Sequence, residues 1–263
     1  DMGLGKTAIT LMAILSLMFD SFEVGKVLVI APLRVAKSTW PSELKKWEGL
    51  DFLKMSVITG SVKEREAALK VPADIYVINR ENVKWLVDTL GSSWPYDCVV
   101  IDELSSFKNH QSQRWKALKK VRPKIRRMVG LTGTPASNGL MDLWAEIGIL
   151  DGGERLGRFI GRFRESYFKP GSLNPSTGVV YSYIPRPGAE EQIYELKEDN
   201  DYINIPERYE TLFKNCLISL AMIYAIADDS DENHSGYQRQ YENSLKTLID
   251  YCQSGISDRR IIF

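Results

Sequence analysis

The sequence predicts an α/β fold in which a parallel sheet carries helices on both faces. Three observations lead to this prediction. Between residues 7 and 150, short apolar runs rich in β-branched residues alternate with longer segments of helical character, as in sheets built from crossover units. Three of the runs end directly in polar or turn-forming loops, where open α/β sheets bind ligands. Hydrophobic residues form 44% of the 263 residues, enough to bury a sizeable core.

Five strands and six helices are predicted in this region. The strands are largely apolar, as expected when both faces of a strand are buried. They cover residues 27–31, 55–59, 74–79, 97–102 and 128–132. The crossover segments have helical character. They cover residues 8–19, 37–47, 63–70, 81–90, 111–121 and 140–150.

The pattern changes after residue 150. Residues 155–168 predict a basic, aromatic helix, in which Phe159, Phe163 and Tyr167 are spaced to face a core. Residues 170–187 are rich in Gly, Pro, Ser and Tyr, which is typical of an irregular segment.

Three parts are therefore expected along the chain: residues 1–150 as a ligand-binding lobe, residues 151–199 as an extension of it, and residues 200–263 as a tail. Two helices, at residues 211–227 and 238–252, are predicted in the tail, for which the sequence suggests no chemistry.

Charge and cysteine content exclude some classes of protein. Lys plus Arg and Asp plus Glu both total 34, so the net charge says nothing about an anionic partner. The three cysteines and two histidines have no metal-ligand spacing, which argues against a zinc site or a disulfide framework. The longest apolar stretch, residues 8–19, is too short to span a bilayer. We therefore expect a cytoplasmic protein.

Basic residues are concentrated in one segment. Residues 108–127 contain nine Lys or Arg and no acidic residue. Such a segment either faces DNA phosphates or is a solvated helix followed by a turn, and the sequence leaves both possibilities open. The six tryptophans are interpreted as packing residues, not as platforms for nucleobases.

The first candidate motif is a phosphate-binding loop at the start of the chain. It consists of Gly3, Leu4, Gly5, Lys6 and Thr7, followed at once by a helical run. Glycines let backbone N–H groups approach phosphates, Lys reaches the β and γ phosphates of ATP, and the Thr hydroxyl is a ligand for Mg²⁺. The helix dipole favours the same anion. The strand that ordinarily precedes such a loop is expected before Asp1.

The second motif is a pair of carboxylates at the end of an apolar strand. Asp102 and Glu103 follow Val99, Val100 and Ile101. In ATPases with a phosphate loop, the Asp of such a pair organises the Mg²⁺ shell and the Glu polarises the attacking water. Lys6, Asp102 and Glu103 are therefore the candidate catalytic residues, with Thr7 and Asp102 as candidate metal ligands.

The third motif follows the last predicted strand. Thr132, Gly133, Thr134 and Pro135 form a predicted tight turn whose hydroxyls offer hydrogen bonds near the γ phosphate. The order of phosphate loop, acidic pair and Thr-Gly-Thr-Pro turn is more specific than any of the three alone.

Together these motifs resemble the first RecA-like lobe of the Swi/Snf family of superfamily 2 helicase-like ATPases, especially the versions found in phages and prophages. The matching segments are residues 1–7, 29–33, 40–43, 79–82, 102–105 and 131–138, in the family's order, with looser similarity over 183–194. One departure is Leu104-Ser105, where many relatives have Ala-His.

The resemblance implies a motor that hydrolyses ATP, with Mg²⁺, while it moves along double-stranded DNA. Thr132, Gly133 and Thr134 would couple the nucleotide state to the grip on DNA. The residues implied to approach the DNA backbone are Pro32, Leu33, Arg34, Asn79 and Arg80.

A motor of this class also needs arginines from a second RecA-like lobe. No Gln-x-x-Gly-Arg-x-x-Arg segment occurs in this sequence, so we expect the chain alone to hydrolyse ATP very slowly. The alternative function is a non-catalytic DNA-binding or interaction module that keeps the fold of the lobe. An unrelated phosphate-loop enzyme, such as a small-molecule kinase, would not be expected to carry the Thr-Gly-Thr-Pro turn.

Overall fold

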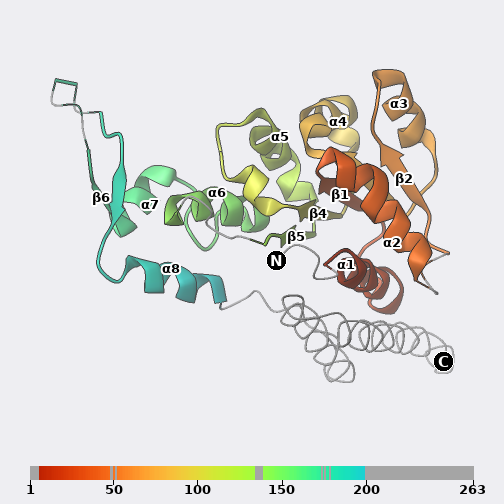
Figure 1. Ribbon diagram of the computed structural model, residues 1–263, viewed down its shortest axis with the longest axis horizontal. Helices are drawn as coiled ribbons and strands as arrows, with labels where there is room; N and C mark the ends of the chain where they lie inside the picture. Colours follow the sequence, from red (N-terminus) through yellow and green to blue (C-terminus); the bar gives the residue numbers. More distant parts are fainter. Residues whose placement is uncertain are drawn as a thin grey trace, which may run out of the picture. The chain divides into compact units, whose positions relative to one another are not determined.

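The computed structural model describes residues 6–47, 50, 52–133, 139–172, 174, 176–177 and 179–198 (Figure 1). The predicted tail, residues 200–263, lies outside these described residues. Gly3, Leu4, Gly5 and Thr134 of the candidate motifs also lie outside them.

A five-stranded sheet has the order β2-β3-β1-β4-β5. Its strands are β1 Val27–Ala31, β2 Met55–Ile58, β3 Ile75–Asn79, β4 Cys98–Asp102 and β5 Arg127–Leu131. The pairs β1–β3 and β2–β3 are parallel, with Val27 and Met55 both opposite Ile75. All five predicted strands are present, with ends that differ by at most one residue, and the predicted fold class is confirmed.

The described residues form two compact units. The first contains residues 6–79 and 96–98, and the second contains residues 80–95 and 99–198.

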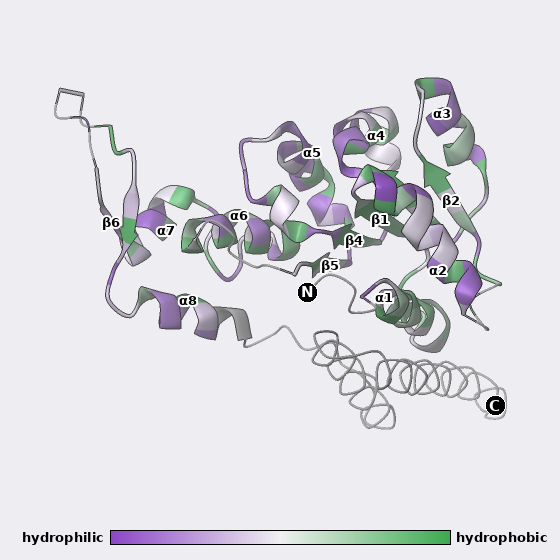
Figure 2. Ribbon diagram, viewed as in Figure 1, coloured by the Kyte–Doolittle hydropathy of each residue, from purple (hydrophilic) through white to green (hydrophobic). Residues whose placement is uncertain are grey.

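In the first unit, β1 and β3 are buried along their whole length, whereas β2 is buried only at alternate residues. The strand β1 is buried at all five positions, and Figure 2 shows it and the helix α1 as strongly hydrophobic. The helix α1 Lys6–Leu15 continues into the π-helical turn η1 Ser16–Asp20 and packs against α2 Trp40–Lys46. A second π-helical turn, η2 Val35–Thr39, leads into α2.

The helix α3 Val62–Lys70 begins with a capping box. Glu64 Oε2 accepts the backbone N–H of Ser61 at 2.6 Å, while Ser61 Oγ accepts the backbone N–H of Glu64 at 3.4 Å. These hydrogen bonds hold the pKa of Glu64 below its ordinary value, because they favour the charged carboxylate. The Ser-x-x-Glu pattern thus fixes where this helix starts.

A carboxylate ties together segments that are far apart in the sequence. Asp97, just before β4, accepts the backbone N–H groups of Gly25 and Lys26 at 2.8 and 3.0 Å. The Tyr96 ring beside it lies 5.4 Å from the Tyr76 ring, and burial raises the pKa of Tyr96. These contacts anchor the residues that lead into β4 next to those that lead into β1.

In the second unit, helices α4 Val83–Leu90 and α5 Gln113–Val121 pack against one another. Single 3₁₀ turns flank the helices and strands of this unit. They are η3 Arg80–Asn82, η4 Gly91–Ser93, η5 Leu104–Phe107 and η6 Arg122–Lys124. The helix α6 Leu140–Asp151 packs against α5, β5 and η5.

Aromatic side chains join α5 to α6. The Trp115 and Trp144 rings stack with centroids 6.1 Å apart, and the His110 ring lies edge-on to Trp144 at 5.2 Å. Trp115 Nε1 donates to Ala145 O at 2.9 Å, so the buried indole N–H is paired.

The other tryptophans are also mostly enclosed. Trp40, Trp47 and Trp94 are buried, and Trp85 is half-buried. The packing interpretation is confirmed for the five buried tryptophans.

The predicted helix at residues 155–168 is wrong in its first part, because α7 begins only at Ile160 and ends at Tyr167. Gly152, Gly153 and Gly157 have φ of 77°, 88° and 82°, a left-handed backbone that ends α6 and interrupts the helical pattern. Phe163 is buried as predicted, but Phe159 lies ahead of the helix and is 66% exposed.

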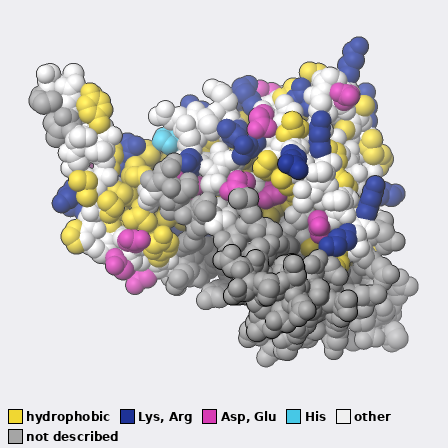
Figure 3. All heavy atoms as spheres, in the orientation of Figure 1, with side chains coloured by type: hydrophobic (Ala, Val, Ile, Leu, Met, Phe, Trp, Pro, Cys, Tyr) yellow, Lys and Arg dark blue, Asp and Glu magenta, His cyan; other side chains and the backbone are white. Residues whose placement is uncertain are grey.

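The predicted irregular segment contains a short hairpin. The strands β6 Phe168–Pro170 and β7 Tyr183–Pro185 pair antiparallel, and α8 Ala189–Glu198 follows. Arg186 Nε donates to Phe168 O at 3.0 Å, and the Arg164 guanidinium lies 4.7 Å from the Tyr183 ring centroid. Hydrophobic side chains gather on the face near α7 and this hairpin (Figure 3).

Candidate functional site

The residues of the phosphate loop that the structure describes begin a helix. Lys6 and Thr7 are the first two residues of α1, and both are half-buried. Thr10 Oγ1 donates to Lys6 O at 2.6 Å within the first turn. The first N–H groups of a helix have no partner within it and carry a partial positive charge. The helix therefore starts where the sequence predicts phosphate to bind.

The acidic pair lies at the carboxyl end of β4. Four of the five residues of this strand are buried, and the fifth, Asp102, is half-buried. Glu103 follows with φ 67° and ψ 67°, a left-handed conformation that few residues other than Gly adopt. Ser105 Oγ donates to Glu103 Oε1 at 2.6 Å. The two carboxylates thus occupy a strand end and the first residue of a constrained turn.

Carboxylate and hydroxyl oxygens suit Mg²⁺, which is usually held by one or two carboxylates and the substrate phosphates. Asp102 and Thr7 supply these atom types. Each of these two side chains, considered by itself, therefore has an atom type that suits this ion.

Sequence reasoning identified Ser105 only as a departure from the family pattern. It did not find that the hydroxyl contacts Glu103. The signal was the spacing: a Ser two residues after a carboxylate can turn back to it, as Ser and Thr hydroxyls do in local turns.

The third motif is described only in part. Thr132 and Gly133 follow β5 and are half-buried. Within β5, Gly130 leaves room for Leu104, because a Cβ added at Gly130 would lie 2.6 Å from Leu104 Cδ2. The strand before the third motif therefore packs directly against the turn after the acidic pair.

The residues predicted to approach DNA differ in exposure. In the parallel register, Ala31 is opposite Asn79, so the ends of β1 and β3 lie side by side. Pro32 is half-buried, whereas Leu33 and Arg34 are exposed. Asn79 is only 6% exposed. Of the two arginines, Arg34 extends into solvent.

Arg80, the residue after β3, pairs with its neighbour. Its Nε lies 3.0 Å from Glu81 Oε1. A phosphate would have to compete with this carboxylate for the guanidinium.

The basic segment 108–127 has mixed roles. Lys108 Nζ lies 3.8 Å from Asp142 Oδ2, Arg122 Nε donates to Leu150 O at 2.9 Å, and Lys119 Nζ lies 4.9 Å from the Trp115 ring centroid. Lys116, Lys120, Arg126 and Arg127 have exposed side chains. Both interpretations of the segment stay open for the exposed residues.

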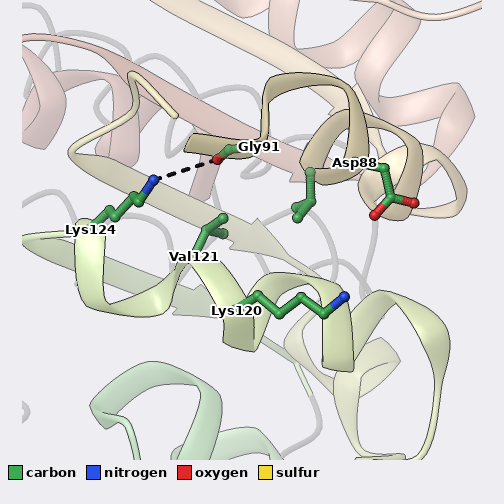
Figure 4. A pocket seen from close by; sticks show the side chains of 6 residues that line it. Asp88, Gly91, Lys120, Val121 and Lys124 are labelled. Carbon is green, nitrogen blue, oxygen red and sulfur yellow. Dashed lines mark hydrogen bonds between the residues drawn. The ribbon is translucent and has the colours of Figure 1, made fainter. Parts of the chain in front are cut away.

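A hollow of about 340 Å³ lies between α4 and α5 (Figure 4). Val87, Asp88 and Gly91 line one side, and residues of α5 and η6 line the other. Lys124 Nζ donates to Ser92 O at 2.8 Å, as expected of a cation at the C-terminal end of a helix. No predicted site residue lines this hollow, which we interpret as a packing seam between the helices.

In the part of the chain that the structure describes, no helix has the length and apolar character needed to cross a membrane.

The sequence matches the SNF2-related domain over residues 1–152. This match covers more than half of the chain and includes all three motifs. The chain therefore belongs to the SNF2-related family of helicase-like ATPases.

Individual relatives support this assignment. Protein p41 of the Acyrthosiphon pisum secondary endosymbiont phage 1 is 45% identical over 174 residues, which cover 64% of this chain and 38% of p41. Helicase ssl-1 of Caenorhabditis elegans is 33% identical over 151 residues, 55% of this chain and 6% of that protein. The chain thus spans a minor part of the length of both relatives.

A solved structure has the same fold. It is the Sulfolobus solfataricus SWI2/SNF2 ATPase core in complex with dsDNA, with a TM-score of 0.55 and 24% sequence identity. The match covers 95% of this chain and 53% of that one. It supports a RecA-like sheet with flanking helices, as the sequence predicts.

Proposed function

We propose that this chain is the ATP-binding lobe of a DNA-dependent ATPase that moves along double-stranded DNA. The observation that carries the proposal is the match to the SNF2-related domain over residues 1–152, which contains the phosphate loop and the acidic pair in the family's order. In this proposal residues 1–150 form the lobe and residues 151–199 its extension.

The proposal assigns each candidate residue a role in binding or hydrolysing ATP. Lys6 binds the β and γ phosphates together with Gly3, Leu4 and Gly5, and Thr7 and Asp102 hold Mg²⁺. Bound Mg²⁺ neutralises charge on the phosphates. Glu103 orients and polarises the attacking water, so that ATP yields ADP and phosphate.

DNA contacts and a second lobe complete the proposed motor. Arg34 and Arg80 neutralise phosphates of the DNA backbone, and Thr132, Gly133 and Thr134 couple nucleotide state to that contact. A second RecA-like lobe supplies arginines, which accelerate hydrolysis in phosphate-loop ATPases by about 10³ to 10⁵.

Substitution of Lys6 tests nucleotide binding directly. We expect Lys6→Ala to abolish binding of a fluorescent ATP analogue, because the variant loses the cation that pairs with the phosphates. Lys63→Ala is the matched control, since Lys63 is an exposed lysine of α3 with no proposed role. Binding is measured by titration, and ATP turnover is measured in parallel with and without double-stranded DNA.

The outcomes separate the candidate functions. If the unsubstituted chain binds nucleotide, Lys6→Ala does not, and turnover is very slow, the result supports an ATP-binding lobe that needs a second lobe for hydrolysis. Fast DNA-stimulated turnover by this chain alone contradicts the need for a second lobe. Failure of the unsubstituted chain to bind nucleotide, together with DNA binding, favours the non-catalytic module.

A further inference from the structure

The turn after β4 holds Glu103 in an uncommon conformation. With φ 67° and ψ 67°, it is one of two non-glycine residues with positive φ among the described residues. Such conformations persist when the surrounding structure fixes them, and they are concentrated at functional sites. The contacts that fix this turn therefore bear on how the Glu103 carboxylate is aimed.

The side chain of Glu103 is fixed by Ser105. Ser105 Oγ lies 2.6 Å from Glu103 Oε1, the short separation typical of a hydroxyl that donates to a carboxylate. The backbone strengthens the link, because the N–H of Ser106 donates to Glu103 O at 3.0 Å. The Ser105 hydroxyl and the Glu103 carboxylate thus belong to one turn that a backbone hydrogen bond closes.

The 3₁₀ turn η5, which contains Ser105, is itself anchored to other residues of the second unit. Leu104 is buried and packs into the space that Gly130 leaves on β5. Phe107 is fully buried, and Lys108 Nζ lies 3.8 Å from Asp142 Oδ2 on α6. The Ser105 hydroxyl is therefore held by contacts on both sides of the turn.

We propose that Ser105 is a positioning residue for hydrolysis: its hydroxyl holds the Glu103 carboxylate in the orientation that polarises the attacking water. This inference rests on the proposed ATPase function. A carboxylate can accept about four hydrogen bonds, so the bond from Ser105 leaves capacity for a water proton. Ser105 stands where many relatives have His, and here the short hydroxyl turns back to the acidic pair.

Ser106 provides a matched control on the next position. Its Oγ is buried and has no hydrogen-bond partner. Ser106→Ala therefore removes a hydroxyl from the same turn without removing a hydrogen bond. Ser105→Thr is the conservative variant, because it keeps a hydroxyl at the same position.

The experiment is single-turnover hydrolysis of ATP, with the chain in excess, combined with an ATP-binding titration and a thermal melt. Ser105→Ala is expected to lower the rate by about tenfold to a hundredfold, the usual effect of a misplaced catalytic group. The Kd for ATP stays within about twofold, because a positioning hydroxyl acts on the reaction and not on phosphate binding. Ser105→Thr restores most of the rate, and Ser106→Ala keeps it.

Three results would overturn the inference: a wild-type rate in Ser105→Ala, an equal fall in Ser106→Ala, or a loss of ATP binding that accounts for the whole effect. A Ser105→Thr variant that melts normally yet stays slow would overturn it as well. Failure of the proposed function is recognised separately. In that case the unsubstituted chain binds ATP no more tightly than Lys6→Ala does, and the inference falls with the function on which it rests.

Discussion

At the scale of single residues, Gly130 shows how a missing side chain shapes the candidate site. Leu104 Cδ2 occupies the position that a side chain at residue 130 would need. Leu104 begins the turn η5, whose Ser105 hydroxyl binds Glu103. A side chain at residue 130 would therefore displace Leu104 in the turn that follows the acidic pair.

Substitution of Gly130 tests this dependence. We expect Gly130→Ala to lower the free energy of unfolding by about 1 to 3 kcal/mol, because added atoms in a packed core force neighbours out of place. Urea unfolding followed by tryptophan fluorescence measures the change. The ATP hydrolysis rate falls as well, since a displaced Leu104 moves Ser105.

Gly148 supplies the control for this prediction. It lies within α6, and a Cβ there would meet no heavy atom within 4 Å. Gly148→Ala is expected to raise the free energy of unfolding by about 0.5 to 1 kcal/mol, the usual gain inside a helix. Equal unfolding curves for the two variants would show that Leu104 has room to move.

At the scale of secondary-structure elements, the junction of α5 and α6 contains the half-buried His110. Burial lowers its pKa below the ordinary 6.5, with smaller contributions from Arg164, Lys116 and Lys119. The unfolded chain therefore binds a proton to this residue more readily than the folded chain does. The stability that neutral His110 contributes is present above pH 6.5 and is lost as the pH falls through the lower folded pKa.

The His110→Phe variant keeps an aromatic ring and removes the titrating group. We expect its urea midpoint to fall less between pH 7.5 and pH 5 than that of the unsubstituted chain. The difference between the two proteins reports on His110 alone, because all other titrating groups are the same in both. The same pH dependence in both would show that the Trp115–Trp144 junction tolerates a charged imidazole.

At the scale of the whole molecule, the proposed motor must contact DNA, and the parallel sheet places two arginines where such a contact can be tested. Arg34 follows β1, and Arg80 follows β3. They belong to the loops at the carboxyl ends of the strands, where ligands of open α/β sheets bind. The proposed contribution of each arginine to DNA binding can be measured separately.

The salt dependence of DNA binding tests this contribution. Binding of double-stranded DNA weakens as salt rises, with a slope of about −0.9 for each phosphate that the protein neutralises. We expect Arg34→Gln and Arg80→Gln each to reduce the slope by about one. Fluorescence anisotropy over a salt series measures it, with Lys63→Gln on α3 as the control.

The same titration examines the basic segment. If residues 108–127 face DNA, Lys116→Gln also reduces the slope, and if they form a solvated face, it does not. Unchanged slopes for both arginine variants would refute the proposed contacts at the ends of β1 and β3.

The strands and the chemical motifs could be predicted from the amino-acid pattern. Buried parallel strands need continuous apolar, β-branched runs, so the residues of β1 and β3 could be predicted almost to their ends. The motifs could also be recognised in the sequence, because phosphate binding and Mg²⁺ coordination require particular residue types at fixed spacings. The family match over residues 1–152 agrees with the resemblance that these motifs suggested.

The start of α7, the exposure of Phe159 and the hydrogen-bond partner of Ser105 could not be predicted from the sequence. Gly157, with a φ of 82°, interrupts the predicted helix, and the spacing of hydrophobic residues does not reveal the backbone conformation of a single residue. The contact from Ser105 to Glu103 depends on the left-handed turn, and Leu104 fits beside it because Gly130 lies on another strand. Such contacts join residues through packing, and sequence spacing alone does not encode them.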